Sequence, residues 1–147
     1  MLALHPGSGS ERKNWPESKW AELVQYLLGS TPWALLVVGG EAEGERLQRL
    51  TAALPPRRVR VAQSLPLAEV AGLLARSRAF VGHDSGISHL AAALGLPGLV
   101  LWGDSPSEIW RPPSDQVVLL RHPAGLSRLP VAYVIDQLER LCVKPAL

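Results

Sequence analysis

Residues 79–97 read AFVGHDSGISHLAAALGLP, and this stretch decides the fold class. Its first four residues are apolar or small and predict a buried strand over residues 79–82. The polar turn at residues 84–86 follows, and the alanine-rich segment behind it predicts a helix over residues 87–94. A strand that leads through a polar turn into a helix is typical of α/β proteins and leaves backbone N–H groups free at the start of the helix.

The same alternation of strand and helix patterns runs through the whole chain. Six strands are predicted, most of them from apolar runs, at residues 1–4, 33–38, 58–62, 79–82, 98–102 and 116–120. Helical patterns lie between and after them, at residues 16–28, 41–53, 67–75, 87–94 and 131–141. Such alternation predicts a parallel sheet with right-handed crossovers. We therefore expect an α/β fold, a doubly wound, Rossmann-like parallel sheet, with residues 1–147 as a single domain.

Composition narrows the class of protein. The chain has 147 residues, of which 47% are hydrophobic and 19% charged, as in ordinary globular proteins. A net charge of +2 is too small to indicate nucleic-acid binding. One cysteine, Cys142, predicts a reducing compartment, and the N-terminus lacks the pattern of a signal peptide. The longest apolar run is too short to span a membrane, so we expect a soluble, cytoplasmic protein.

Polar, glycine-bearing loops follow the first and the fourth predicted strands. In a sheet of this class, ligands bind at the carboxyl ends of the strands where the strand order reverses, which lies between these two. The first loop, residues 5–16, reads HPGSGSERKNWP. Ser8 and Ser10 offer hydroxyl groups, Gly9 permits close backbone approach, and Lys13 offers a positive charge to a phosphate. The loop has neither a P-loop ending nor a full dinucleotide fingerprint, and an ordinary connecting turn is the alternative.

The second loop opens the helix at residues 87–94. Asp84 or Ser85 has the residue type of a helix N-cap, which is the structural alternative to a role in binding. Together with Gly86, the start of this helix offers N–H groups and a dipole that favour a phosphate. The Asp84 carboxylate would repel a phosphate, so we expect it to face sugar hydroxyl groups. His89, one turn further on, is expected to brace the loop or to serve only in packing.

Acidic residues follow the second predicted strand. An acid at this position binds ribose hydroxyl groups in proteins of this class, and both Glu41 and Glu43 qualify. Both are equally suited to the first turn of a helix.

Two other readings of these residues find little support. Asp84, Ser85 and His89 have the residue types of a hydrolase triad, but the elbow sequence of hydrolases is absent. The four histidines show no metal-ligand spacing, and no Asp-x-Asp pair exists, so no metal site is expected.

Three segments together resemble a known family. They are residues 5–16 (HPGSG, then KxWP), 37–43 (VVGGxxE) and 81–97 (VGHDSGxxHLAAALGxP), in the order and spacing of that family. The chain resembles the C-terminal, nucleotide-sugar-binding domain of the ADP-heptose:lipopolysaccharide heptosyltransferases, glycosyltransferase family 9. It departs from the family at residues 103–106 (GDSP), where a Gly-Pro-Thr type of sequence is usual, and at His83, where asparagine is more common.

The resemblance implies one half of a GT-B glycosyltransferase, whose active site lies between two Rossmann-like domains. It further implies a role for each matching residue: Ser8, Gly9, Ser10 and Lys13 at the diphosphate, Glu43 at the ribose, Asp84 at the donor sugar, Ser85 and Gly86 at phosphate or sugar, and His89 as support for the loop. The backbone near Ser64 and Leu65 is implied to line an adenine pocket.

The implied reaction is the metal-independent, inverting transfer of a heptose from an ADP-sugar donor to a lipid-linked saccharide acceptor, without a cofactor. In the family, the general base and the acceptor site belong to an N-terminal domain, so the catalytic residues are left unassigned here. We expect this chain alone to bind donor and to be inactive, with membrane contact confined to the full-length protein.

A stand-alone nucleotide or nucleotide-sugar binding module is the alternative to half of a transferase. An exposed apolar face near Trp102 and Trp110 would favour a missing domain or a dimer contact, and a clean surface would favour the module. Trp15, Trp20 and Trp33 are expected to lie in the core.

Overall fold

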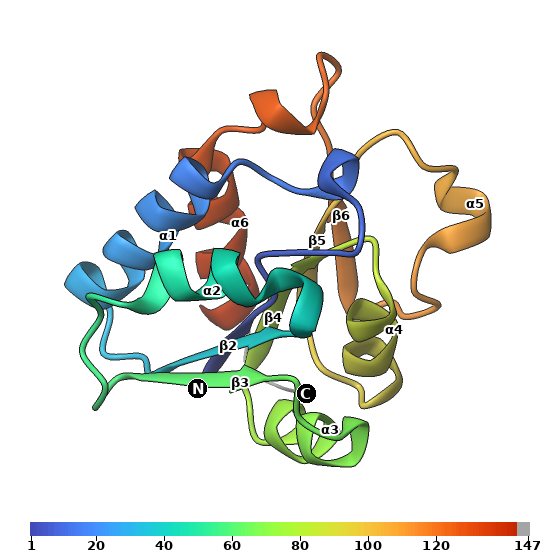
Figure 1. Cartoon of the computed structure of the whole chain (residues 1–147). Helices are drawn as coiled ribbons and strands as arrows, with labels where there is room; N and C mark the ends of the chain where they lie inside the picture. The colour runs from blue at the N-terminus through green and yellow to red at the C-terminus, as the bar shows by residue number, and fades with distance from the viewer. Residues whose placement is uncertain (144–147) are drawn as a thin grey trace.

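Six parallel strands form one sheet in the order β3-β2-β1-β4-β5-β6 (Figure 1). The structure is a computed structural model and describes residues 1–143. The strands are β1 (Leu2–Leu4), β2 (Leu35–Gly39), β3 (Val59–Gln63), β4 (Ala79–His83), β5 (Gly98–Leu101) and β6 (Val117–Leu120). The chain winds outward from β1 to β3, returns to β4 beside β1, and winds outward again to β6. This order confirms the predicted doubly wound sheet, with its switch point between β1 and β4.

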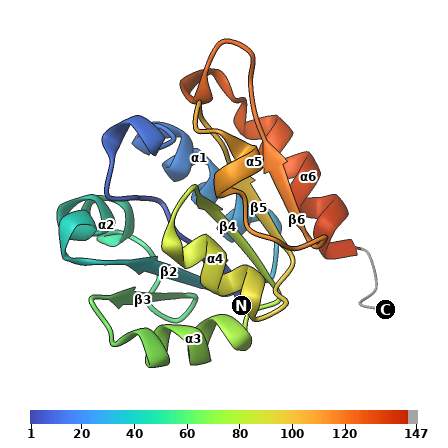
Figure 2. The ribbon, with the colours of Figure 1, turned by 90° about the vertical axis from the view of Figure 1, so that its right-hand side faces the viewer.

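Helices cover both faces of the sheet (Figure 2). They are α1 (Glu17–Ser30), α2 (Gly44–Thr51), α3 (Leu67–Ala75), α4 (Gly86–Ala93), α5 (Ser107–Trp110) and α6 (Val131–Val143). One core lies between the sheet and α1, α2 and α6, and a second lies between the sheet and α3 and α4. The predicted elements lie within two residues of those observed, counting the 3-10 turn Glu41–Glu43 as the start of α2. Helix α5 was not predicted, because it is a single turn inside a proline-rich loop.

Strand β1 shows how the sheet is buried on both sides. Leu2 and Leu4 belong to the core beneath α1 and α6, whereas Ala3 belongs to the opposite core. This follows from the alternation of side chains along a strand. Trp15 and Trp20 are buried as predicted and meet edge to face with ring centroids 5.4 Å apart, while Trp33 is half-buried against the same core.

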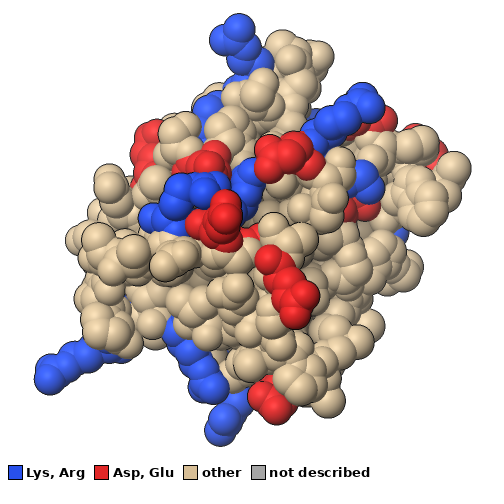
Figure 3. All heavy atoms as spheres, viewed as in Figure 1, with Lys and Arg blue, Asp and Glu red and all other residues tan. Residues whose placement is uncertain are grey.

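Surface charge, helix length and the state of Cys142 also bear on the class of protein. Figure 3 shows acidic and basic side chains side by side on one face rather than a patch of one sign. Within residues 1–143, no helix has both the length and the apolar character needed to cross a membrane. Cys142 is half-buried on α6, and burial raises the pKa of its thiol, which favours the unreactive protonated form.

Candidate functional site: a cleft at the strand switch point

A cleft of about 470 Å³ opens where β1, β2 and β4 end. It lies at the switch point of the sheet, as predicted for a ligand site of this fold class. The loop after β1, the loop after β2, the turn after β3 and the start of α4 all contribute to it. Its lining comprises His5, Ser8, Gly9, Val38, Gly39, Gly40, Glu43, Ser64, Leu65, Leu67, Val70, Ser85, Gly86, Ile87 and Leu90.

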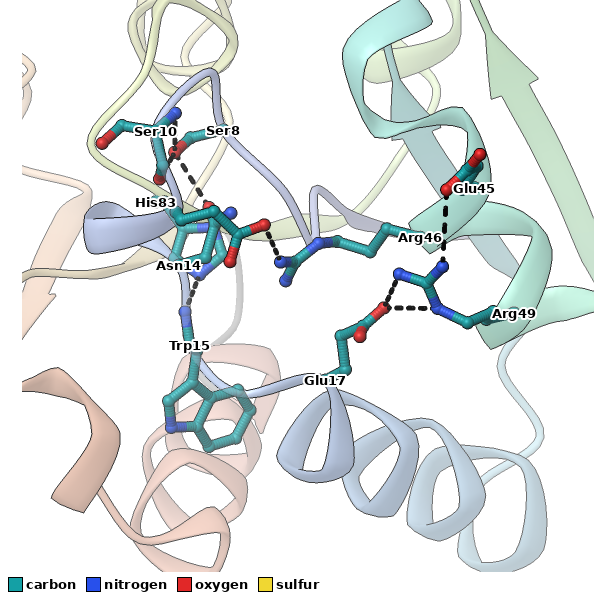
Figure 4. A network of polar contacts seen from close by, with 10 residues as sticks. Ser8, Ser10, Asn14, Trp15, Glu17, Glu45, Arg46, Arg49 and His83 are labelled. Atoms are coloured by element: carbon teal, nitrogen blue, oxygen red, sulfur yellow. Dashed lines mark hydrogen bonds and ion pairs between the residues drawn. The ribbon is translucent and has the colours of Figure 1, made fainter.

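Internal hydrogen bonds shape the loop after β1 (Figure 4). Ser8 Oγ lies 2.8 Å from Asn14 Oδ1 and 3.0 Å from the Ser10 carbonyl oxygen, and the Ser10 N–H donates to it at 3.4 Å. The loop therefore folds back on Ser8 as an organised turn. Ser8 and Gly9 line the cleft, but Ser10 does not.

His83 lies in the protein interior and holds this loop through a hydrogen bond. The backbone N–H of Trp15 donates to His83 Nε2 at 2.9 Å (Figure 4). The His83 ring packs edge to face on Trp20. Burial lowers the pKa of His83 to about 3, so the ring stays neutral and Nε2 stays an acceptor. His83 does not line the cleft, and neither do residues 103–106. The two departures from the family pattern therefore lie outside the cleft wall.

Lys13 and Asp84 form an ion pair beside the cleft. Lys13 Nζ lies 3.1 Å from Asp84 Oδ2, in an orientation outside the range of a hydrogen bond. The Asp84 side chain is 9% exposed and that of Lys13 is 42% exposed, so the buried carboxylate holds a mobile ammonium group. Neither residue lines the cleft, although Asp84 directly precedes Ser85, which does. The structure thus places Lys13 next to the second loop, as an anion-binding role would need.

The start of α4 is open towards the cleft. Ser85 is the N-cap residue, but its hydroxyl makes no capping hydrogen bond to the helix. Instead, Ser85 Oγ lies 3.3 Å from Nδ1 of His5, a residue that the sequence reasoning missed. His5 is 4% exposed, and burial lowers its pKa to about 4 against the opposing charge of Glu43. Its position at the end of the first strand was the one signal that could have found it.

Glu43 lies in the cleft wall, in the 3-10 turn Glu41–Glu43 that follows β2. Its Oε2 accepts a hydrogen bond of 2.7 Å from the Gly40 N–H. The loop after β1 packs closely on it, because a Cβ added at Gly7 would lie 2.5 Å from Glu43 Cγ. Of the two acids considered from the sequence, Glu43 lines the cleft and Glu41 does not.

Apolar side chains make up much of the remaining lining of the cleft. They come from β2, the turn after β3, α3 and α4: Val38, Leu65, Leu67, Val70, Ile87 and Leu90. Leu67 is 64% exposed and leaves an apolar surface at the cleft edge. Ser64 has a φ of 54°, in the left-handed region, and its N–H donates to the Gly39 carbonyl at 2.9 Å. On the β3 side of the cleft the lining is thus mainly apolar, whereas the loop after β1 and the start of α4 supply polar groups.

His89 does not brace the loop at residues 84–86, contrary to the expectation. Its ring is exposed, and Nε2 lies 2.9 Å from the carbonyl oxygen of Trp110, so it links α4 to α5. Its Nε2 is thus engaged with the last residue of α5 rather than with the loop. Of the two tryptophans whose surroundings distinguish the alternatives, Trp102 is buried, whereas Trp110 is exposed beside exposed Ile109.

Side chains of the types that bind metals do not cluster in the part of the chain that the structure describes. Across residues 1–143, no three His, Cys, Asp or Glu side chains gather as metal ligands would. The cleft itself contributes one acid, Glu43, and one histidine, His5.

Comparisons with known proteins agree with this geometry. Glycosyltransferase family 9 (heptosyltransferase) matches residues 1–128. Lipopolysaccharide heptosyltransferase 1 of Pseudomonas aeruginosa is 44% identical over 104 residues, which cover 70% of this chain and 28% of the relative. The chain superposes on E. coli ADP-heptose lps heptosyltransferase II with a TM-score of 0.90 and 26% identity, over 98% of this chain and 46% of that one.

A second solved structure, E. coli heptosyltransferase WaaC with ADP, matches with a TM-score of 0.87 and 28% identity, over 95% of this chain and 43% of that one. The chain thus spans less than half the length of the relatives it matches. These matches confirm the predicted fold, one half of a GT-B glycosyltransferase. With its doubly wound sheet, its cleft at the switch point and a family match over most of its length, the chain belongs to glycosyltransferase family 9, the heptosyltransferases.

Proposed function

We propose that this chain is the donor-binding domain of a glycosyltransferase and that the cleft at the strand switch point binds a nucleotide-sugar of the ADP-heptose kind. The observation that carries the proposal is the mixed lining of the cleft, in which the loop after β1 and the start of α4 supply polar groups and the turn after β3 and α3 supply apolar side chains. A nucleoside diphosphate is mixed in the same way, with a flat base at one end and an anion at the other.

The polar groups of this lining suit the diphosphate. Gly9 and Gly86 allow a phosphate to approach the backbone, Ser8 and Ser85 offer hydroxyl groups, and the start of α4 offers N–H groups and a favourable dipole. Lys13 adds a mobile positive charge from the same loop, to which Ser10 also belongs. When a phosphate of the donor pairs with Lys13, the neighbouring Asp84 carboxylate loses that partner and becomes free to accept hydrogen bonds from the donor sugar.

The rest of the lining suits a nucleoside. Glu43 lies in the turn after β2, where a carboxylate binds ribose hydroxyl groups in this fold class. A flat base would lie against Leu65 and Leu67, where burial of a partly exposed leucine favours binding. Two solved structures of a relative are E. coli heptosyltransferase WaaC with ADP and with ADP-2-deoxy-2-fluoro heptose, which supports adenine as the base and heptose as the sugar.

The full reaction that we propose is the inverting transfer of the sugar to a lipid-linked saccharide in the biosynthesis of lipopolysaccharide core or a related glycan. Negative charge grows on the leaving diphosphate, and Lys13 with the α4 N-terminus would stabilise it without a metal ion. The acceptor hydroxyl needs a general base, which we place in a further domain of the complete protein. On this proposal the present chain binds donor and does not transfer it.

Calorimetric titration of the chain with ADP and with UDP, in the presence of EDTA, tests the proposal. We expect binding of ADP, weaker binding of UDP, and about tenfold weaker ADP binding in Lys13→Ala because a charged hydrogen bond is lost. Arg12→Ala is the matched control, since Arg12 is an exposed residue of the same loop that pairs only with exposed Asp104. Binding of neither nucleotide would refute the donor site, and preference for UDP would refute the ADP-sugar assignment.

A further inference from the structure

The hydroxyl of Ser85 is not where an N-cap hydroxyl usually lies. A serine at the N-cap normally accepts a hydrogen bond from the second or third N–H of its helix. In α4 these N–H groups belong to Ile87 and Ser88, and neither donates to Ser85 Oγ. Of the N-cap residues of α1 to α5, only Ser85 has a hydroxyl group, and its missing capping bond departs from the usual geometry of a serine at this position.

His5 accounts for that departure. Its Nδ1 lies 3.3 Å from Ser85 Oγ, and the two residues follow β1 and β4, the strands on either side of the switch point. The His5 ring is almost fully buried in the cleft wall, so it has little freedom to release the hydroxyl. The ring is neutral because burial lowers the pKa of His5 to about 4, and a neutral ring does not add a charge next to Glu43.

We infer that His5 is a positioning residue for donor binding: it draws the Ser85 hydroxyl away from the α4 amides and so leaves them free for a phosphate of the donor. The inference rests on the proposed function. If the proton of the neutral ring is on Nδ1, His5 donates to Ser85 Oγ, and the Ser85 hydroxyl hydrogen is free to be donated to a phosphate oxygen. Without His5, the hydroxyl would return to the helix and compete with the ligand for its N–H groups.

A double-mutant cycle measured by calorimetry with ADP tests this role. We expect His5→Leu and Ser85→Ala each to weaken ADP binding about five- to tenfold, as for a lost hydrogen bond. We expect His5→Leu to change affinity less than about twofold in the Ser85→Ala background, because His5 acts through Ser85. His5→Phe, which keeps a flat ring of similar size, replaces His5→Leu if that variant does not fold.

Amide hydrogen exchange gives a second readout that needs no ligand. In the chain without ADP, His5→Leu is expected to slow exchange at Ile87 and Ser88 severalfold, because the Ser85 hydroxyl then caps the helix. The double variant is expected to keep fast exchange at both amides. A residue with a merely structural role would not slow exchange at these positions.

The outcomes separate this inference from the proposed function. If the wild-type chain binds ADP but His5→Leu weakens binding equally with and without the Ser85 hydroxyl, or not at all, the positioning role is wrong and the donor site stands. Unchanged exchange at Ile87 and Ser88 would also overturn it. If the wild-type chain binds no ADP, the proposed function fails and this role fails with it.

Discussion

Replacing His83 with glutamine is expected to make the fold less sensitive to acid. In the folded chain burial lowers the pKa of His83 from 6.5 to about 3. Between these two values the unfolded chain binds one proton that the folded chain does not. Above pH 6.5 His83 is neutral in both states and does not reduce the free energy of unfolding. As the pH is lowered from 6.5 towards 3, the free energy of unfolding falls by about 1.4 kcal/mol per pH unit.

The expected size of the effect follows from this difference in pKa. Over the two units from about pH 6.5 to 4.5, His83 accounts for a loss of about 3 kcal/mol, a large share of the stability of a small domain. Glutamine does not titrate, and its amide oxygen keeps an acceptor for the Trp15 N–H that His83 Nε2 now accepts. His5, whose pKa is lowered to about 4, contributes a similar loss that His83→Gln leaves in place.

Urea unfolding at a series of pH values measures this effect directly. The slope of unfolding free energy against pH, between about pH 6 and 4.5, is expected to be smaller by about one proton in His83→Gln than in the wild-type chain. His89→Gln is the control, because its ring is exposed on α4. An unchanged slope in His83→Gln would refute the argument that a buried, neutral His83 holds the loop after β1.

Three further substitutions test the packing and the charges. Gly82→Ala would bring a Cβ to 2.8 Å from Phe80 Cε1 and is expected to lower the free energy of unfolding by about 1–3 kcal/mol. Gly72→Ala has open space around it on α3 and is expected to raise the free energy of unfolding by about 0.5–1 kcal/mol. Urea unfolding measures both changes, and equal effects would contradict the packing described. Arg58→Met removes a guanidinium group that donates at 2.6–2.8 Å to three carbonyl oxygens, one in the last turn of α1 and two between α1 and β2. This change is expected to cost about 2–4 kcal/mol, while Arg60→Met, at an exposed position of β3, stays within about 0.5 kcal/mol. A thermal melt in which both variants match the wild type would be the contrary result. Asp84→Asn releases Lys13 and is expected to tighten ADP binding by up to about fivefold while weakening the binding of an ADP-sugar, and calorimetry showing the same change for both ligands would argue against a sugar contact at Asp84.

The fold could be predicted because its signals are local. Residues 35–39 and 79–82 are uninterrupted runs of apolar and small residues, and a strand buried on both faces needs such a run. The place of the site followed from the strand order, since ligands of doubly wound sheets bind where that order reverses. For the same reason, the sequence could predict that Glu43, Ser8 and Ser85 line the cleft, because each lies in or next to a loop at the carboxyl ends of the strands.

The contacts that complete the site could not be predicted, because they join residues far apart in the sequence. His5 meets Ser85 across 80 positions, and Trp15 meets His83 across 68. The periodicity of the sequence carries no information on such pairs. A histidine beside the site is equally consistent with ligand binding and with a role in packing. His83 proved to be an interior support and His89 a link to α5, whereas His5, which was not singled out, lies in the cleft wall.

The most direct test of the central claim is a titration of ADP into the ¹⁵N-labelled chain, followed by amide chemical shifts. The account predicts that the largest changes occur at the cleft, at the amides of Gly9, Gly40, Leu65 and Gly86. It predicts little change at Thr31, at the opposite end of the strands. Changes that cluster away from the cleft, or no changes at saturating ADP, would contradict the assignment of this cleft as the donor site.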